Sequence, residues 1–250
     1  MEKFVKVLDY RHVRNVYIVP DIHGRFDLLK KKLAELRFDP EKDRCVAVGD
    51  LIDRGKYSHR CLEFLRQNES VLGNHELQAI LGVFDSYQAR LHKRWGGEWL
   101  YKFSEDEQAV FAREFLKLPI AIEILHQDKK YGVVHADVWG NDWEIFKQEL
   151  IKHKSSDIYS GDVPYHGCSS RRRIRSWFTS QDHQNHQPIA NIDQVYVGHC
   201  IFNEPLSHFN INYIDTGAFA TNELTVVKAG DTFEQASCNH LVYSQNSFWE

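Results

Sequence analysis

The sequence predicts an α/β fold, because short apolar runs alternate with segments of helical periodicity along the 250 residues. Hydrophobic residues make up 42% of the chain and aromatic residues 13%, which is enough for a sizeable core. No repeat, low-complexity segment or Pro/Gly-rich linker divides the chain. We therefore expect a single domain over residues 1–250.

Three segments have the apolar spacing of amphipathic helices. Apolar residues recur every three or four positions in 26–36, 77–84 and 110–118. Ser104 and Glu107 precede the last segment at the spacing of a capping box. We expect the apolar side chains of all three helices to pack on a core.

Seven short runs rich in β-branched and aromatic residues read as strands. They span residues 16–19, 45–48, 70–72, 120–125, 131–134, 195–197 and 212–214.

Polar residues follow six of these strands directly, where open α/β sheets place their ligands. They form a chemically selective set, because most are metal-ligand types and none is a cysteine. The set comprises Asp21, His23, Asp50, Asn74, His135 and His199, with Asp215 after the last strand.

Mixed carboxylate, imidazole and amide ligands favour manganese, iron or zinc over calcium. Six ligands are too many for one tetrahedral zinc ion, whereas two ions about 3.5–4 Å apart that share one carboxylate would fit. Such a pair binds phosphoryl oxygens and generates hydroxide near neutral pH, so the residues predict a two-metal phosphoester hydrolase.

Five ordered motifs also resemble those of the phosphoprotein phosphatase family of metallophosphoesterases, above all the bacteriophage lambda protein phosphatase and its bacterial relatives. The motifs are Asp21-Ile-His23-Gly24, Gly49-Asp50-Leu-Ile-Asp53-Arg54-Gly55, Gly73-Asn74-His75-Glu76, His135 and Gly198-His199. The resemblance implies a four-layer sandwich of two mixed sheets flanked by helices, with a dinuclear metal site at the carboxyl edge of the sheets.

The resemblance also implies metal-binding roles, with Mn²⁺ expected and iron or zinc as alternatives. Asp21 and His23 should bind the first ion, and Asp50 should bridge both. The second ion should bind Asn74, which also contacts substrate, together with His135 and His199.

Catalytic roles carry over in the same way. Arg54 should bind the phosphate, because a planar guanidinium matches two phosphate oxygens. His75 should be the general acid for the leaving oxygen, and Asp53 should orient it.

The resemblance also implies a second phosphate-binding arginine, in the run Arg171-Arg172-Arg173. We assign this role to Arg171, with Arg173 as the alternative. Arg172, Arg173 and Arg175 should otherwise be solvated or contact an acidic protein substrate.

The predicted function is hydrolysis of phosphoserine and phosphothreonine in proteins, with phosphotyrosine and small phosphoesters as further substrates. A hydroxide that bridges the two metals, rather than an enzyme nucleophile, would attack phosphorus. The alternatives are a symmetrical dinucleoside tetraphosphate hydrolase and an inactive phosphoprotein-binding homologue.

Net charge and the lack of long apolar segments limit the expected partners and location. A net charge of −4 gives no electrostatic case for nucleic acid or an anionic membrane as partner. Without a signal peptide or spanning segment in the sequence, we expect a cytoplasmic protein, and a monomer.

Five dispersed cysteines argue against a disulfide framework. Cys200, which follows His199, could be a small buried residue or an oxidation-sensitive thiol near the metals.

Overall fold

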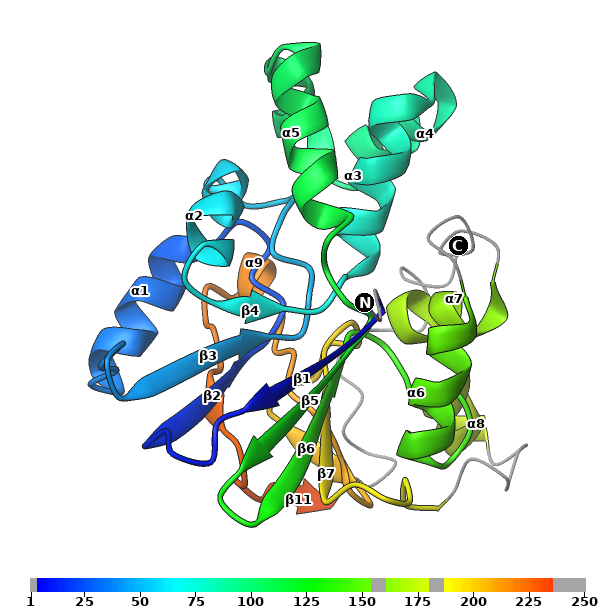
Figure 1. Cartoon of the computed structure of the whole chain (residues 1–250). Helices are drawn as coiled ribbons and strands as arrows, with labels where there is room; N and C mark the ends of the chain where they lie inside the picture. Colours follow the sequence, from blue (N-terminus) through cyan, green and yellow to red (C-terminus); the bar gives the residue numbers. More distant parts are fainter. Residues whose placement is uncertain (1–3, 154–160, 180–186, 236–250) are drawn as a thin grey trace.

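Two mixed β-sheets flanked by helices form the protein in the computed structural model, which describes residues 4–153, 161–179 and 187–235 (Figure 1). The seven-stranded sheet has the order β1 (Val5–Asp9), β5 (Ala121–His126), β6 (Lys129–Val134), β7 (Gln194–Val197), β9 (Ile211–Tyr213), β8 (Leu206–His208) and β11 (Glu234–Gln235). The four-stranded sheet has the order β10 (Val227–Lys228), β2 (Asn15–Val19), β3 (Asp43–Ala47) and β4 (Glu69–Ser70).

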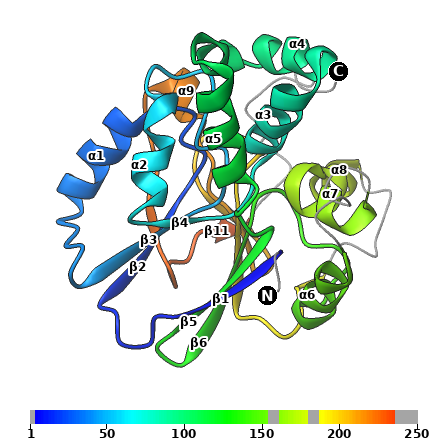
Figure 2. The same ribbon diagram turned by 45° about the horizontal axis from the view of Figure 1, so that its top comes forward.

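Helices cover the outer face of each sheet, and further helices stand beyond the strand ends (Figures 1 and 2). Beside the smaller sheet lie α1 (Phe26–Glu35) and α2 (Cys61–Leu65), which follows the 3₁₀ turn η1 (Ser58–Arg60). Beside the larger sheet lie α6 (Trp143–Lys152), α7 (Asp162–Ser169) and α8 (Arg172–Thr179). The remaining helices are α3 (Asn74–Phe84), α4 (Ser86–Arg94), α5 (Glu105–Phe115), α9 (Ala218–Thr221) and the 3₁₀ segment η2 (Gly97–Lys102).

The two sheets pack face to face, which explains why their central strands read as continuous apolar runs. Val16 and Ile18 of β2 belong to an apolar cluster shared with strands of the larger sheet, such as Val133 of β6. Tyr17 and Val19 belong to the cluster that includes the outer helices. Since successive side chains of a strand point to opposite faces, both faces of β2 are buried and the predicted four-layer sandwich is confirmed.

All seven expected strands are present, with ends shifted by one or two residues, and so are the three expected helices. The capping box is also confirmed, because Ser104 and Glu107 bond each other's backbone N–H groups. Two expectations are wrong: the side chains of Phe84 and Val110 are 72% and 39% exposed. Helices α3 and α5 lie beyond the sheets, so only part of their circumference meets other elements.

No helix within the described ranges is long and apolar enough to cross a membrane. Four cysteines are free thiols, whereas Cys238 lies outside the described residues.

Arg173 is a buried structural residue, so the expectation that it is solvated is wrong. Its side chain is 2% exposed, and the guanidinium donates to the Asp137 carboxylate through Nε at 2.9 Å. It also donates to the Asn141 amide oxygen at 2.9 Å and the Gly140 carbonyl at 2.6 Å. Burial raises the pKa of Asp137, but the hydrogen bond from His166 and the Arg173 charge outweigh this effect and lower it. The pair ties α8 to the loop after β6.

We predict that Arg173→Met lowers the free energy of unfolding by about 3–5 kcal/mol, because it leaves the buried Asp137 carboxylate without its cation. Urea titration measures this loss. Arg172 is exposed and adjacent, so Arg172→Met is the matched control and should change stability by less than about 0.5 kcal/mol. Equal losses in the two variants would contradict the structural role of Arg173.

Candidate active site

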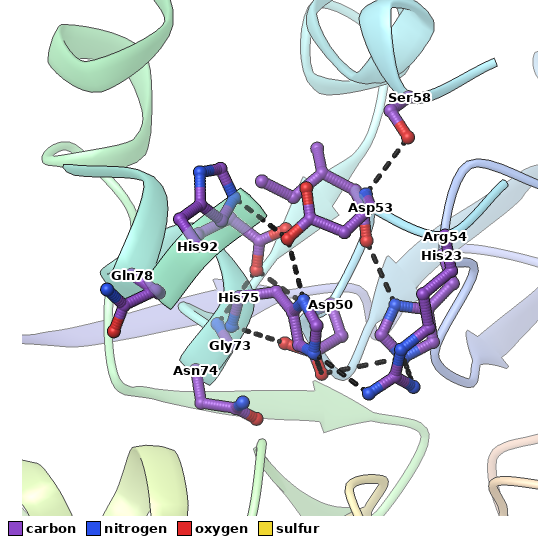
Figure 3. Close-up of polar contacts among 12 residues, drawn as sticks. His23, Asp50, Asp53, Arg54, Ser58, Gly73, Asn74, His75, Gln78 and His92 are labelled. Atoms are coloured by element: carbon purple, nitrogen blue, oxygen red, sulfur yellow. Dashed lines mark hydrogen bonds and ion pairs between the residues drawn. The ribbon is translucent and has the colours of Figure 1, made fainter. Parts of the chain in front are cut away.

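The structure brings the six predicted ligand residues together where the strands end. Asp21 and His23 follow β2, Asp50 follows β3, and Asn74 opens α3. Figure 3 shows His23, Asp50 and Asn74 in one region of the fold. His135 follows β6 and His199 follows β7, and their ring centroids lie 5.0 Å apart.

Five residues of this region have left-handed backbone conformations that cost energy for side chains other than glycine. They are His23 (φ 44°), Asp50 (φ 48°), Asp53 (φ 73°), Arg54 (φ 63°) and His199 (φ 64°). Sharp turns of this kind aim polar side chains back over the strand ends, so the backbone strain is concentrated at the candidate metal-binding and catalytic residues.

Backbone carbonyls fix the tautomers of two histidines. His23 donates Nδ1–H to the Ile52 carbonyl at 2.9 Å, and His135 donates Nδ1–H to the Val48 carbonyl at 2.8 Å. In the neutral form of each ring, Nε2 therefore keeps its lone pair. The Nε2 atoms of His23 and His135 lie 3.7 and 3.4 Å from Oδ2 of Asp50, which is 2% exposed.

Several buried acceptor atoms here suit a cation. Among the described residues, Asp21 Oδ1 and His199 Nε2 are buried without a hydrogen-bond partner. Asn74 Oδ1 lies 2.9 Å from His135 Nε2, and two lone pairs at this distance need a proton or a cation between them. Unpaired buried acceptors are costly, so these residues fit divalent metal ions.

In the part of the chain that the structure describes, two groups of side chains have ligand atoms within 4.8 Å of one another, and Asp50 belongs to both. One adds His135 and His199, which are two of the residues predicted to bind the second ion. The other adds His23 and His75, although His75 is the predicted acid. Asp21 lies outside that group, and its Oδ2 accepts the His199 N–H at 3.0 Å.

Asp215, which follows β9, is an acid of this site to which sequence reasoning gave no role. Burial, followed by the neighbouring Asp215 and Asp50 carboxylates, raises the pKa of Asp21 well above its usual range. Burial likewise raises the pKa of Asp215 to about 6. Three carboxyl groups in one buried region repel as anions, and bound cations would favour their ionised forms.

Arg54 reaches into the same region (Figure 3). Its Nη1 lies 2.8 Å from His23 Nε2, and its Nη2 lies 3.1 Å from His75 Nε2. The guanidinium stacks on the Phe219 ring at 4.3 Å from the centroid, and the Arg54 backbone N–H donates to the Gly96 carbonyl. Its cationic group is therefore held beside the candidate metal ligands, as a phosphate-binding residue requires.

His75 and Asp53 form a buried pair, with His75 Nδ1 2.7 Å from Asp53 Oδ2. Two further side chains that sequence reasoning missed bind the same carboxylate: His92 Nε2 lies 2.9 Å from Oδ2, and Trp99 Nε1 donates to Oδ1 at 2.7 Å. Burial raises the pKa of Asp53, but the hydrogen bonds from His75 and His92 outweigh this effect and bring it to about 2. Asp53 is therefore an anion at neutral pH.

Arg171 is half-buried and lies near the second candidate ligand group. Burial lowers the pKa of His199 well below its usual range, and the Arg171 charge adds to the shift. Because Arg173 is engaged by Asp137, Arg171 stays our prediction for the second phosphate-binding arginine. Cys200 is half-buried, and desolvation raises the pKa of its thiol to about 12.

Comparison with known proteins agrees with this geometry. A family model described as calcineurin-like phosphoesterase matches residues 14–200. Serine/threonine-protein phosphatase 1 of Salmonella typhimurium is 31% identical over 91% of this chain and 97% of its own. A symmetrical bis(5'-nucleosyl)-tetraphosphatase of Actinobacillus succinogenes is 46% identical over 72% of this chain and 62% of its own.

Solved structures support the fold alone, at low sequence identity. A serine/threonine phosphatase from Saccharomyces cerevisiae has a TM-score of 0.62 at 15% identity and covers 94% of this chain and 85% of its own. A putative diadenosine tetraphosphatase has a TM-score of 0.54 at 19% identity, covering 89% of this chain and 97% of its own. Because the family model spans most of the chain and a relative above 30% identity covers nearly all of it, this protein belongs to the calcineurin-like metallophosphoesterases and is a hydrolase of the phosphatase type.

Proposed function

We propose that this metallophosphoesterase is a protein phosphatase that hydrolyses phosphoserine and phosphothreonine, with phosphotyrosine and small phosphoesters as further substrates. The observation that carries the proposal is the similarity to bacterial serine/threonine phosphatases over nearly the whole length of both chains. The partner is then a phosphorylated protein or peptide. We further propose that the protein acts as a cytoplasmic monomer, without a nucleic-acid or membrane partner.

Two divalent cations, proposed to be Mn²⁺ with iron or zinc as alternatives, complete this site. Asp21 and His23 would hold one ion, Asn74, His135 and His199 the other, and Asp50 both. When bound, they would supply Lewis acidity and charge neutralisation for the transferred phosphoryl group. The unpaired atoms of Asp21 and His199 support this assignment.

The side chains of the protein divide the remaining tasks. Arg54 and Arg171 bind oxygens of the phosphate dianion and orient it, with Arg54 placed beside both His23 and His75. His75 gives a proton from Nε2 to the leaving oxygen. Asp53 accepts the Nδ1–H of the same ring, which keeps Nε2 directed to the substrate and stabilises the protonated imidazole.

A second candidate function is hydrolysis of symmetrical dinucleoside tetraphosphates. It is supported by the higher identity, over a shorter part of both chains, to an enzyme of that name. An inactive phosphoprotein-binding homologue is the third candidate, and the complete set of ligand residues together with His75 argues against it.

We predict that the purified, Mn²⁺-loaded protein releases phosphate from phosphoserine and phosphothreonine peptides with a higher kcat/KM than it cleaves diadenosine tetraphosphate. The reason is that the similarity to the serine/threonine phosphatase covers 97% of that protein, whereas the similarity to the tetraphosphatase covers 62% of that enzyme. Phosphate release and chromatography of the nucleotides measure the two rates. A higher kcat/KM on the dinucleotide would establish the second function instead. No turnover on either substrate would leave the inactive phosphoprotein-binding homologue as the remaining candidate.

Asp50 and Asp53 should differ in what they control. We predict that Asp50→Asn lowers bound metal and turnover together, because the shared ligand loses its charge. Asp53→Asn should retain the metals and lower kcat by about 10²–10⁴-fold, because it acts on the acid rather than on a metal ligand. Metal analysis beside kinetics separates the two outcomes. Asp128→Asn, at an exposed position, is the control, and metal loss in Asp53→Asn would contradict the division of roles.

The role of His75 makes its own prediction. His75→Asn should lower kcat on a phosphoserine peptide by about 10²–10⁴-fold and on an aryl phosphate by less. The reason is that a phenol of pKa about 10 leaves without full protonation, whereas a serine alkoxide does not. His59→Asn, at an exposed histidine, is the matched control. Equal losses on both substrates would contradict the acid role. Loss of metal would make His75 a ligand.

A further inference from the structure

A second histidine contacts the carboxylate that holds the proposed general acid. His92 of α4 is fully buried, and its Nε2 lies 2.9 Å from the Asp53 oxygen that also contacts His75 at 2.7 Å. Figure 3 shows the His92 and His75 rings approaching the Asp53 carboxylate from different sides. An ionised carboxylate only accepts hydrogen bonds, so both ring nitrogens that face it carry hydrogen.

Tyr101 fixes the tautomer of His92. The Tyr101 hydroxyl lies 3.0 Å from Nδ1 of His92. Burial, with the nearby Asp53 charge, raises the pKa of Tyr101 to about 12, so the hydroxyl stays protonated and donates. His92 therefore accepts at Nδ1 and donates at Nε2, which directs its N–H to Asp53.

Two glycines make room for this arrangement. A Cβ at Gly97 would lie 2.2 Å from His92 Nε2, and a Cβ at Gly82 would lie 2.1 Å from the Tyr101 hydroxyl oxygen. Any larger residue at either position would displace the ring or the hydroxyl. The close approach shows that the backbone of α3 and η2 is fitted to these two side chains.

Both carboxylate oxygens of Asp53 accept hydrogen bonds from side chains. Oδ2 accepts from His75 and His92, and Oδ1 accepts from the Trp99 indole N–H. The backbone N–H of Asp53 is also engaged, because it donates to Ser58 Oγ at 2.9 Å. Rotation of the carboxylate toward the nearby metal ligands would break three hydrogen bonds to a charged acceptor.

We propose that His92, fixed by Tyr101, is a positioning residue that holds the Asp53 carboxylate so that the His75 ring keeps Nδ1–H on Asp53 and presents Nε2 to the leaving oxygen. The inference rests on the proposed general-acid role of His75. The side-chain hydrogen bonds of His92 are with Asp53 and Tyr101. It acts through the orientation of Asp53.

The kinetic test compares His92→Phe, which removes the donor, with His92→Gln, whose amide N–H can replace it. His92→Phe should lower kcat on a phosphoserine peptide by about 10–100-fold, the size typical of an outer hydrogen-bond partner, with less loss on an aryl phosphate and unchanged KM. His92→Gln should recover most of the rate. His59→Phe is the control at an exposed histidine and should behave like the wild type.

A double-variant cycle separates positioning from general damage. In a His75→Asn background, His92→Phe should cause no further loss, because the acid that it positions is gone. A full additional loss there, or equal losses on alkyl and aryl substrates, overturns the proposal. If His92→Phe does not fold, Tyr101→Phe decides by the same substrate comparison, and wild-type rates on both substrates would overturn it.

A spectroscopic readout keeps this inference separate from the proposed function. The ¹⁵N shifts of the His75 ring in the metal-free protein should report a single Nδ1–H tautomer in the wild type and a mixture in His92→Phe. An unchanged tautomer in the variant would overturn the positioning role. A His75→Asn variant without leaving-group dependence would instead remove the acid role, whatever the tautomer shows.

Discussion

The site depends on keeping one buried carboxylate, Asp50, ionised. Burial raises the pKa of Asp50, but His135 and His75 outweigh this effect and hold it well below its usual range. An unpaired buried carboxylate costs several kcal/mol, so the fold can bury Asp50 as an anion only with the neighbouring histidines around it. Burial, followed by the charges of neighbouring carboxylates that include Asp50, raises the pKa of Asp21 well above its usual range and that of Glu76 to about 8. The result is a concentration of carboxyl groups for which divalent cations are the natural partners.

Glu76 explains how the fold brings Asp50 to this place. Its two carboxyl oxygens accept the backbone N–H groups of Asp50 at 2.9 Å, Leu51 at 2.8 Å and Gly73 at 3.0 Å. The loop after β3 is thereby joined to the start of α3, which carries the His75 ring. A Cβ at Gly73 would lie 2.2 Å from Asp50 Oδ1, so the close approach requires glycine. The fourth residue of Gly73-Asn74-His75-Glu76 thus shapes the site without facing the substrate region.

Sequence reasoning located the candidate ligands because each follows a strand directly, and strand ends meet at one edge whatever the details of packing. His92 gave no such signal, since it lies in the polar helix SYQARLHKR and resembles a surface residue there. Arg173 was misread for the same reason: its partner Asp137 is distant in sequence, and an arginine run reads as solvated. The β1 segment was also missed, because its alternation over Val5–Asp9 is short and half polar. What could not be predicted is the pairing of polar residues that only the tertiary fold brings together.

The strained backbone at the site is maintained by hydrogen bonds between the loops themselves. The N–H groups of Ile22 and His23 both donate to the Asp50 carbonyl, at 3.0 and 2.9 Å, and Gly24 N–H donates to the Leu51 carbonyl at 2.8 Å. A left-handed residue costs about 1–3 kcal/mol, so isolated loops would relax, whereas these bonds fix the two turns against each other. Neither turn can therefore relax without breaking hydrogen bonds to the other. The ligand geometry belongs to the pair of loops as a unit, and this is why residues from separate strands can share one rigid site.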